Sequence, residues 1–175
     1  MTSQQFKNLV DIGQIKQEPG DQKEFDGLLH SGRTRLKDSR LEALSLESRF
    51  DLAYNAAHAL SLAALRWHGY RSENRYIVFQ CLQQTIGVGP EVWRVLAHCH
   101  NLRNRGEYEG LLEVNERLVL DLIQAAEAVL AEVERLGKIA SRRDLEKTLG
   151  EPPAWGRFRD QVTFMTLINL FRSEL

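Results

Sequence analysis

The segment from Leu41 to Trp67 constrains the fold most strongly, because it combines length with a helical pattern and a high density of alanine. The alanines in its middle are Ala53, Ala56, Ala57, Ala59, Ala63 and Ala64. Small side chains let neighbouring helices approach one another closely. The segment is therefore predicted to form a helix at the centre of an all-α bundle.

Apolar residues at three- and four-residue spacing predict further helices on both sides of this segment. One is expected from residue 21, and Asp38-Ser39 offers a cap for the central helix that follows. Pro90 suits the first position of another helix, and residues 112–136 are expected to form the last long one. Long helices joined in this order predict an antiparallel up-and-down bundle with extra terminal helices.

The chain between the central helix and Pro90 contains a turn and a short apolar segment. Gly69 suits the left-handed conformation just past the end of a helix. Residues 76–86 are rich in β-branched side chains, so a strand is arguable there, but the helical surroundings favour a helix. This region therefore adds to the predicted bundle and does not interrupt it.

Three regions are expected along the chain. Residues 1–20 contain a short amphipathic run and are predicted to be a mobile arm or a short docking helix. Residues 21–137 form the bundle, and residues 138–175 form a C-terminal helical extension. The extension carries an apolar face that needs covering by the bundle or by a second subunit.

Charge and cysteine content limit the functional classes. With 23 basic and 24 acidic residues the net charge is −1, so no global field draws the chain to nucleic acid or to anionic lipid. Any contact with RNA must be local, and no membrane association is expected. Cys81 and Cys99 lie in apolar segments, and no long apolar run is present, which favours a reduced, cytoplasmic setting without a disulfide.

A polar stripe runs along the alanine-rich helix. It consists of Asp51, Tyr54, Asn55 and His58, which share one helix face at spacings of three, four and seven residues. One interpretation is a hydrogen-bond network that fixes the helix register. The other is the wall of a pocket that faces Arg103, in which Asp51 holds Arg103 by a bidentate pair.

Residues 98–110 place polar chemistry between two apolar helical segments. Arg103-Asn104 is expected near the end of a helix, before a turn over residues 106–110, where an arginine can offer its donors to phosphate or carboxylate. The trio His98-Cys99-His100 looks like a set of metal ligands. On a helix, however, residues two apart point to different faces, so we expect neither a metal site nor a cofactor.

Together these residues carry a resemblance to a known family. Residues 49–58, residues 69–72 and Arg103-Asn104 resemble the HEPN family of small helical bundles, whose signature is Arg, usually Asn, and then His four to six residues on. Tyr108 stands at the commonest position of that His, and no His occurs downstream. By resemblance, the family includes metal-independent ribonucleases, toxins paired with small nucleotidyltransferase antitoxins, and non-catalytic relatives.

The resemblance implies a function and a set of site residues. We expect a nucleic-acid-related homodimer, a toxin–antitoxin or RNA-processing component whose metal-independent ribonuclease activity is weak or lost. The alternative is a non-catalytic dimeric module that binds a nucleotide or a protein. Expected catalytic residues are Arg103, as the cation, and His58, in the acid–base role of the missing His. Expected binding residues are Asp51, Tyr54, Asn55, Asn104 and Tyr108, the last as a pocket wall or a site of nucleotide attachment.

Overall fold

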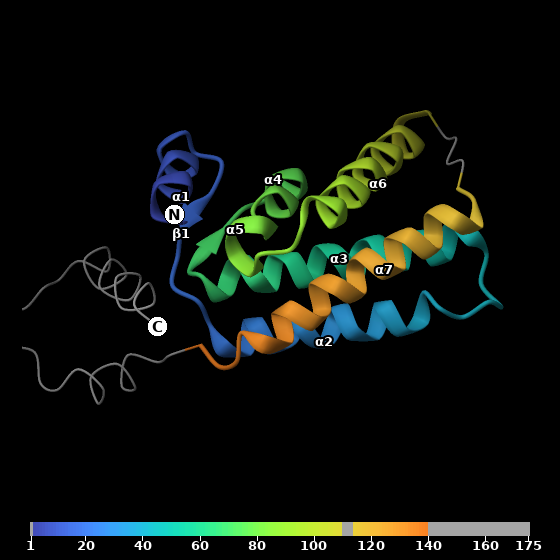
Figure 1. The fold of residues 1–175 in the computed structure, drawn as a ribbon, viewed down its shortest axis with the longest axis horizontal. Coiled ribbons are helices and arrows are strands. Elements are labelled where there is room, and N and C mark those ends of the chain that lie inside the picture. The colour runs from blue at the N-terminus through green and yellow to red at the C-terminus, as the bar shows by residue number, and fades with distance from the viewer. Residues whose placement is uncertain (1, 110–113, 140–175) are drawn as a thin grey trace, which may run out of the picture.

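The computed structural model describes residues 2–109 and 114–139, with side chains over 4–106 and 114–139, and it shows a mostly helical chain (Figure 1). The elements are α1 (Thr2–Asp11), β1 (Lys16–Gln17), α2 (Gln22–Asp38), α3 (Leu46–Trp67), β2 (Tyr70–Arg71), α4 (Arg75–Gln80), α5 (Leu82–Ile86), α6 (Pro90–Glu109) and α7 (Glu116–Arg135). The long helices alternate in direction along the chain, so the predicted all-α bundle is confirmed.

The alanine-rich helix α3 lies at the centre of this bundle, as predicted. It packs most extensively against α2 and α7, while α4, α5 and α6 cover another of its sides (Figure 1). Its alanines at 53, 56, 57, 63 and 64 are fully buried. Because none of these side chains extends beyond a methyl group, α2 and α7 can approach the α3 backbone closely.

The N-terminal cap of α3 differs from the predicted one. Ser45, with an extended backbone, accepts a hydrogen bond from the Ser48 amide at 3.2 Å and is the cap that starts the helix. Ser39 has helical backbone angles and belongs to the C-terminal end of α2, where its amide donates to carbonyl oxygens of the last turn. Residues 39–45 therefore connect α2 to α3, and the helix predicted to start at Leu41 starts at Leu46.

Other predicted boundaries agree with the structure more closely. Gly69 has a φ of +79°, which turns the chain from α3 into β2. Pro90 is the first residue of α6. The apolar segment 76–86 is helical, although Cys81 separates α4 from α5. Helix α6 continues through Gly106 to Glu109, so residues 106–109, where a turn was expected, are helical.

The N-terminal residues are a docked helix, the second of the two predicted alternatives. Phe6 of α1 and Ile15 are 4% and 2% exposed. The Phe6 ring stacks on Tyr70 with 4.6 Å between the ring centroids. These side chains join a second apolar core that includes Leu65 and Val78, and β1 pairs antiparallel with β2 beside it. The burial of Phe6 and Ile15 stabilises the attachment of α1 to the bundle.

Two buried arginines tie the ends of α3 to other elements, and neither contact was predicted. Near the start of the helix, Arg49 donates to Glu116 at 2.9 Å and to the Ser39 carbonyl oxygen at 3.0 Å. This arrangement joins the ends of α2, α3 and α7. Near the other end, Arg66 is 1% exposed and anchors the segment that precedes α2.

Arg66 uses its whole guanidinium in that contact. Nε donates to Glu24 at 2.9 Å, Nη1 to the Glu18 carbonyl oxygen at 3.1 Å, and Nη2 to the Pro19 carbonyl oxygen at 2.9 Å. Nη2 also lies 3.2 Å from the Glu18 carboxylate. Arg71 reaches the same two carboxylates, at 3.0 Å to Glu18 and 2.7 Å to Glu24. The hydrogen bond from Arg71 is the main cause that holds the pKa of Glu18 below its usual value.

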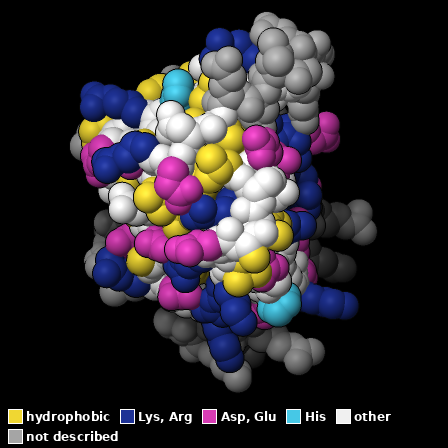
Figure 2. Space-filling view, turned by 90° about the vertical axis from the view of Figure 1, so that its right-hand side faces the viewer, with side chains coloured by type: hydrophobic (Ala, Val, Ile, Leu, Met, Phe, Trp, Pro, Cys, Tyr) yellow, Lys and Arg dark blue, Asp and Glu magenta, His cyan; other side chains and the backbone are white. Residues whose placement is uncertain are grey.

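Charges of both signs are interspersed on the face shown in Figure 2, without a large area of one sign. This distribution fits the near-zero net charge. In the part of the chain that the structure describes, no helix combines the length and the apolar character needed to cross a membrane.

Two glycines of α2 give a matched test of helix packing. A Cβ at Gly32 would lie 2.6 Å from two side-chain atoms of the fully buried Leu60, whereas a Cβ at Gly27 would meet nothing within 4 Å. We expect Gly32→Ala to lower the free energy of unfolding by about 1–2 kcal/mol, because overpacking outweighs the gain in helix propensity. Gly27→Ala should raise it by about 0.5–1 kcal/mol. Urea denaturation of both variants checks this, and equal effects would contradict the close approach of α2 to α3.

Candidate functional site

The polar stripe of α3 faces α4 and α6, and its central residue is Tyr54. This side chain is fully buried, and its ring packs edge-on against Phe79 of α4 with 5.7 Å between the ring centroids. Phe79, also fully buried, packs against His58 of α3 and His100 of α6 as well. Phe79 is therefore the apolar base on which polar side chains of α3 and α6 gather. We call the whole group the Tyr54 cluster; its members are Tyr54, Asn55, His58, Arg75, Phe79, His100, Arg103 and Asn104.

Two guanidinium groups lie over the Tyr54 ring. The central carbon of Arg103, from α6, is 5.2 Å from the ring centroid, and that of Arg75, at the start of α4, is 5.8 Å away. Arg75 also donates to the side-chain oxygen of Asn55 at 3.3 Å. The negative face of an aromatic ring attracts cations, so Tyr54 helps to hold both positive charges in one place.

A chain of hydrogen bonds joins Tyr54 to α6. The Tyr54 hydroxyl lies 2.8 Å from Nδ1 of His100, and Nε2 of His100 lies 3.0 Å from the side-chain nitrogen of Asn104. With the Asn104 amide donating to Nε2, the proton of a neutral His100 is on Nδ1, which donates to Tyr54. The chain fixes the rotamers of all three side chains next to Arg103.

His58 is held in its neutral form. Burial is the main cause that lowers its pKa to about 4, and the positive charges of Arg75 and Arg103, together with His100, lower it further. Near neutral pH the imidazole therefore presents one acceptor and one donor and carries no charge.

The expected pair between Asp51 and Arg103 is not formed among the residues that the structure describes. Asp51 is exposed, and its backbone carbonyl oxygen accepts a hydrogen bond from the Asn55 side chain at 2.8 Å. The Arg103 guanidinium lies over Tyr54, one turn further along α3. The stripe is wide enough for Asp51 to stay at its solvent edge while Tyr54 and His58 are turned toward the neighbouring helices.

Tyr108 was predicted as a binding residue in place of the family His. Its backbone belongs to the last turn of α6, and its side chain lies outside the described residues. Residues 140–175, which make up almost all of the predicted C-terminal extension, also lie outside them.

Sequence reasoning missed three members of the Tyr54 cluster: Arg75, Phe79 and His100. For His100 a signal existed, because it precedes Asn104 by one helical turn and so shares its face. The sequence interpretation weighed His100 only as a metal ligand. Arg75 and Phe79 carry no comparable signal, because they come from a short apolar segment whose position depends on how it packs against α3.

The two cysteine thiols are held in their protonated form. Cys81 and Cys99 are free and buried, and burial raises the pKa values of their thiols to about 11 and about 12. Within residues 2–109 and 114–139, no group of three or more His, Cys, Asp or Glu side chains could hold a metal ion.

Comparison of this chain with family models, curated proteins and solved structures found no match. The resemblance to the HEPN family therefore stays a prediction from residues 49–58, residues 69–72 and Arg103-Asn104.

Proposed function

We propose that this chain is a HEPN-like protein that binds RNA through a phosphate group at the Tyr54 cluster. The observation that carries the proposal is the convergence of Arg75 and Arg103 over one aromatic ring. Two guanidiniums that come from different helices can donate to a single phosphate from two directions. In a chain of net charge −1, such a pair supplies the local positive potential that RNA binding needs.

The same geometry supports only weak ribonuclease chemistry. Attack of a ribose 2′-hydroxyl on the adjacent phosphate requires a base, an acid and a cation next to the developing charge. Arg103 supplies the cation, and neutral His58 can accept a proton. With a pKa of about 4, however, His58 is a weak base and is rarely protonated near pH 7, whereas acid–base catalysis works best with a pKa close to the working pH.

The lowered pKa of His58 also favours the second candidate function, a non-catalytic module that binds a nucleotide. In that case the Tyr54 cluster binds the phosphate and catalyses no reaction of it. A homodimer, and a nucleotidyltransferase-type antitoxin as partner, belong to the proposal through the family resemblance.

Binding of a labelled single-stranded RNA tests the phosphate site. We expect Arg75→Gln and Arg103→Gln each to weaken binding about tenfold, because each removes charge-assisted hydrogen bonds to phosphate. Each should also reduce the slope of log affinity against log salt by about 0.7. The matched control is Arg94→Gln. Arg94 is exposed on α6 and lies nine residues before Arg103, on the opposite helix face, so its removal should change little. Equal losses in all three variants would show nonspecific attraction and overturn the assignment.

A cleavage assay on total RNA without added metal separates the two candidates. We expect slow cleavage at most, lost in both His58→Ala and Arg103→Gln, while His58→Ala retains RNA binding. Binding without any cleavage would favour the non-catalytic module. Fast cleavage that survives both substitutions would refute the assignment of His58 and Arg103 as catalytic residues.

A further inference from the structure

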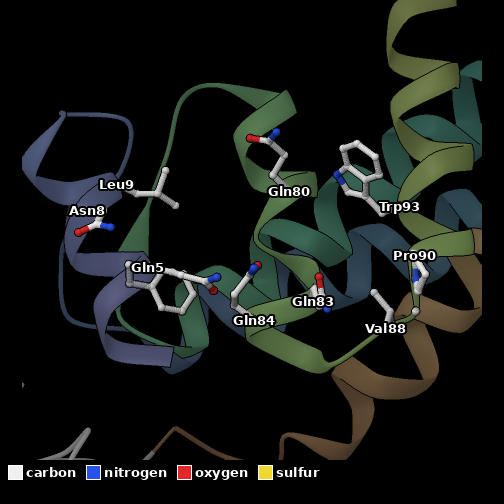
Figure 3. Close-up of a pocket in the computed structure, with 11 residues that line it drawn as sticks. Gln5, Asn8, Leu9, Gln80, Gln83, Gln84, Val88, Pro90 and Trp93 are labelled. Carbon is white, nitrogen blue, oxygen red and sulfur yellow. The ribbon is translucent and has the colours of Figure 1, made fainter. Parts of the chain in front are cut away.

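A cavity lies outside the Tyr54 cluster, between α1, α5 and the start of α6 (Figure 3). Its volume is about 480 Å³, within the range of roughly 300–1,000 Å³ that is common for small-molecule sites. The walls come from segments distant in sequence, because α1 packs onto the bundle through Phe6. The region in which the sequence indicated only an arm or a docking helix therefore completes a binding cavity.

The polar lining of this cavity consists of amides. They are Gln5, Asn8, Gln80, Gln83 and Gln84. The amide groups of Gln5 and Gln84 approach to 3.2 Å across the space between α1 and α5, and Figure 3 shows them pointing toward each other. The Gln84 amide nitrogen also lies within hydrogen-bond distance of the Gln80 and Cys81 carbonyl oxygens, so it is held in place by its own helix. The amides of Gln80 and Gln83 can each offer a donor pair and an acceptor side by side, the arrangement that recognises the edge of a nucleobase.

The rest of the lining is apolar, with an aromatic side chain on one wall. Trp93 of α6 is half-buried and stands across the cavity from Leu9 of α1 (Figure 3). An indole face supports stacking with a planar ring, which is how proteins commonly hold unpaired bases. Among the described residues that line the cavity, none is charged, so it suits a neutral planar group and offers nothing to a phosphate.

The cavity lies next to the Tyr54 cluster along α6. Trp93 and His100 are seven residues apart, which places them on the same helix face about 10 Å apart along the axis. The Tyr76 ring contacts both, with centroid distances of 6.4 Å to Trp93 and 5.7 Å to His100. A neutral, amide-lined cavity thus lies within a few helical turns of a pair of arginines, and the two places divide between them the chemistry of a base and of a phosphate.

We infer that this cavity binds a nucleobase, which stacks on Trp93 and pairs its edge with the glutamine amides. The inference goes beyond the proposed phosphate site and does not require it. The base can belong to an RNA whose phosphate lies at Arg75 and Arg103, or to a free nucleotide. A base from RNA and a base from a free nucleotide would make the same contacts in the cavity, so an experiment must distinguish them.

Titration of the whole protein with adenosine, guanosine, cytidine and uridine tests the site directly, with calorimetry for affinity and NMR for the Trp93 indole and glutamine amide signals. We expect at least one nucleoside to bind and to shift these signals. Gln80→Met and Gln83→Met, both at exposed positions, should each weaken binding at least fivefold. Gln124→Met, at an exposed position of α7 outside the cavity, is the matched control and should have no effect.

Two further titrations identify the source of the base. If an RNA binds at least tenfold more tightly than the matching nucleoside, and this difference in affinity is lost in Arg103→Gln, the base in the cavity belongs to RNA. A 5′-monophosphate that binds as tightly as the RNA indicates a free nucleotide. If Arg103→Gln still binds the nucleoside, the assignment of the cavity as a nucleobase site holds even if the proposed phosphate site is wrong. Absence of binding by all four nucleosides at millimolar concentration, or binding unchanged in Gln80→Met and Gln83→Met, overturns the inference.

Discussion

Replacing Arg66 by alanine is expected to lower the free energy of unfolding by about 3 kcal/mol, the lower end of the cost of removing one partner of a buried ion pair, because the carboxylates of Glu18 and Glu24 are themselves partly exposed. Arg66 is 1% exposed and makes hydrogen bonds to Glu24 and to the carbonyl oxygens of Glu18 and Pro19. Its loss leaves the carbonyl oxygens of Glu18 and Pro19 without this donor and opens a space at the end of α3, while Glu24 keeps its contact with Arg71. This loss is a large fraction of the total free energy of unfolding of a typical domain.

Arg71→Ala is the matched control for Arg66→Ala. Arg71 binds the same two carboxylates, but 35% of its side chain is exposed, so solvent screens its ion pairs. We expect a loss of about 1 kcal/mol or less. Arg66→Lys should fall between the two, because an ammonium keeps the charge and cannot reproduce the fork of guanidinium donors. Urea denaturation measures the free energy of unfolding of the three variants. An equal loss in Arg71→Ala and Arg66→Ala would contradict the importance of burial at Arg66.

The second large effect is a dependence of stability on pH that comes from His58. Its pKa is lowered from 6.5 to about 4 in the folded state, so the unfolded chain binds more protons between these two pH values. Stability from this group is complete above pH 6.5 and is lost as the pH falls toward 4. The loss amounts to about 3 kcal/mol by pH 4, because each pKa unit corresponds to about 1.4 kcal/mol.

A comparison with His58→Gln isolates this contribution. Glutamine does not titrate, whereas the acidic side chains respond to pH in both proteins. The difference in unfolding free energy between parent and variant should therefore narrow, or reverse in favour of the variant, by about 3 kcal/mol between neutral pH and pH 4. Chemical denaturation over that range measures it, together with direct titration of His58 by NMR. Parallel pH profiles would show that His58 titrates normally and that the two arginines do not converge on it.

Much of the architecture is contained in local sequence patterns. Alanine density placed α3 at the centre, Pro90 marked the start of α6, and Gly69 marked the turn after α3. The spacing of Tyr54 and His58 placed them on one helix face, and the structure turns both toward Phe79. These features were predictable because helical periodicity, helix starts and left-handed glycines depend on neighbours only a few residues away.

Only the tertiary structure decided which side chains meet. Asp51 belongs to the stripe on α3, yet it stays exposed, while Arg75 and His100 join Tyr54 from α4 and α6. The amide cavity likewise exists because α1 docks beside α5. A sequence pattern fixes the face on which a residue lies. The helix that covers that face is selected by the packing of the whole apolar core, which involves residues far apart in the chain.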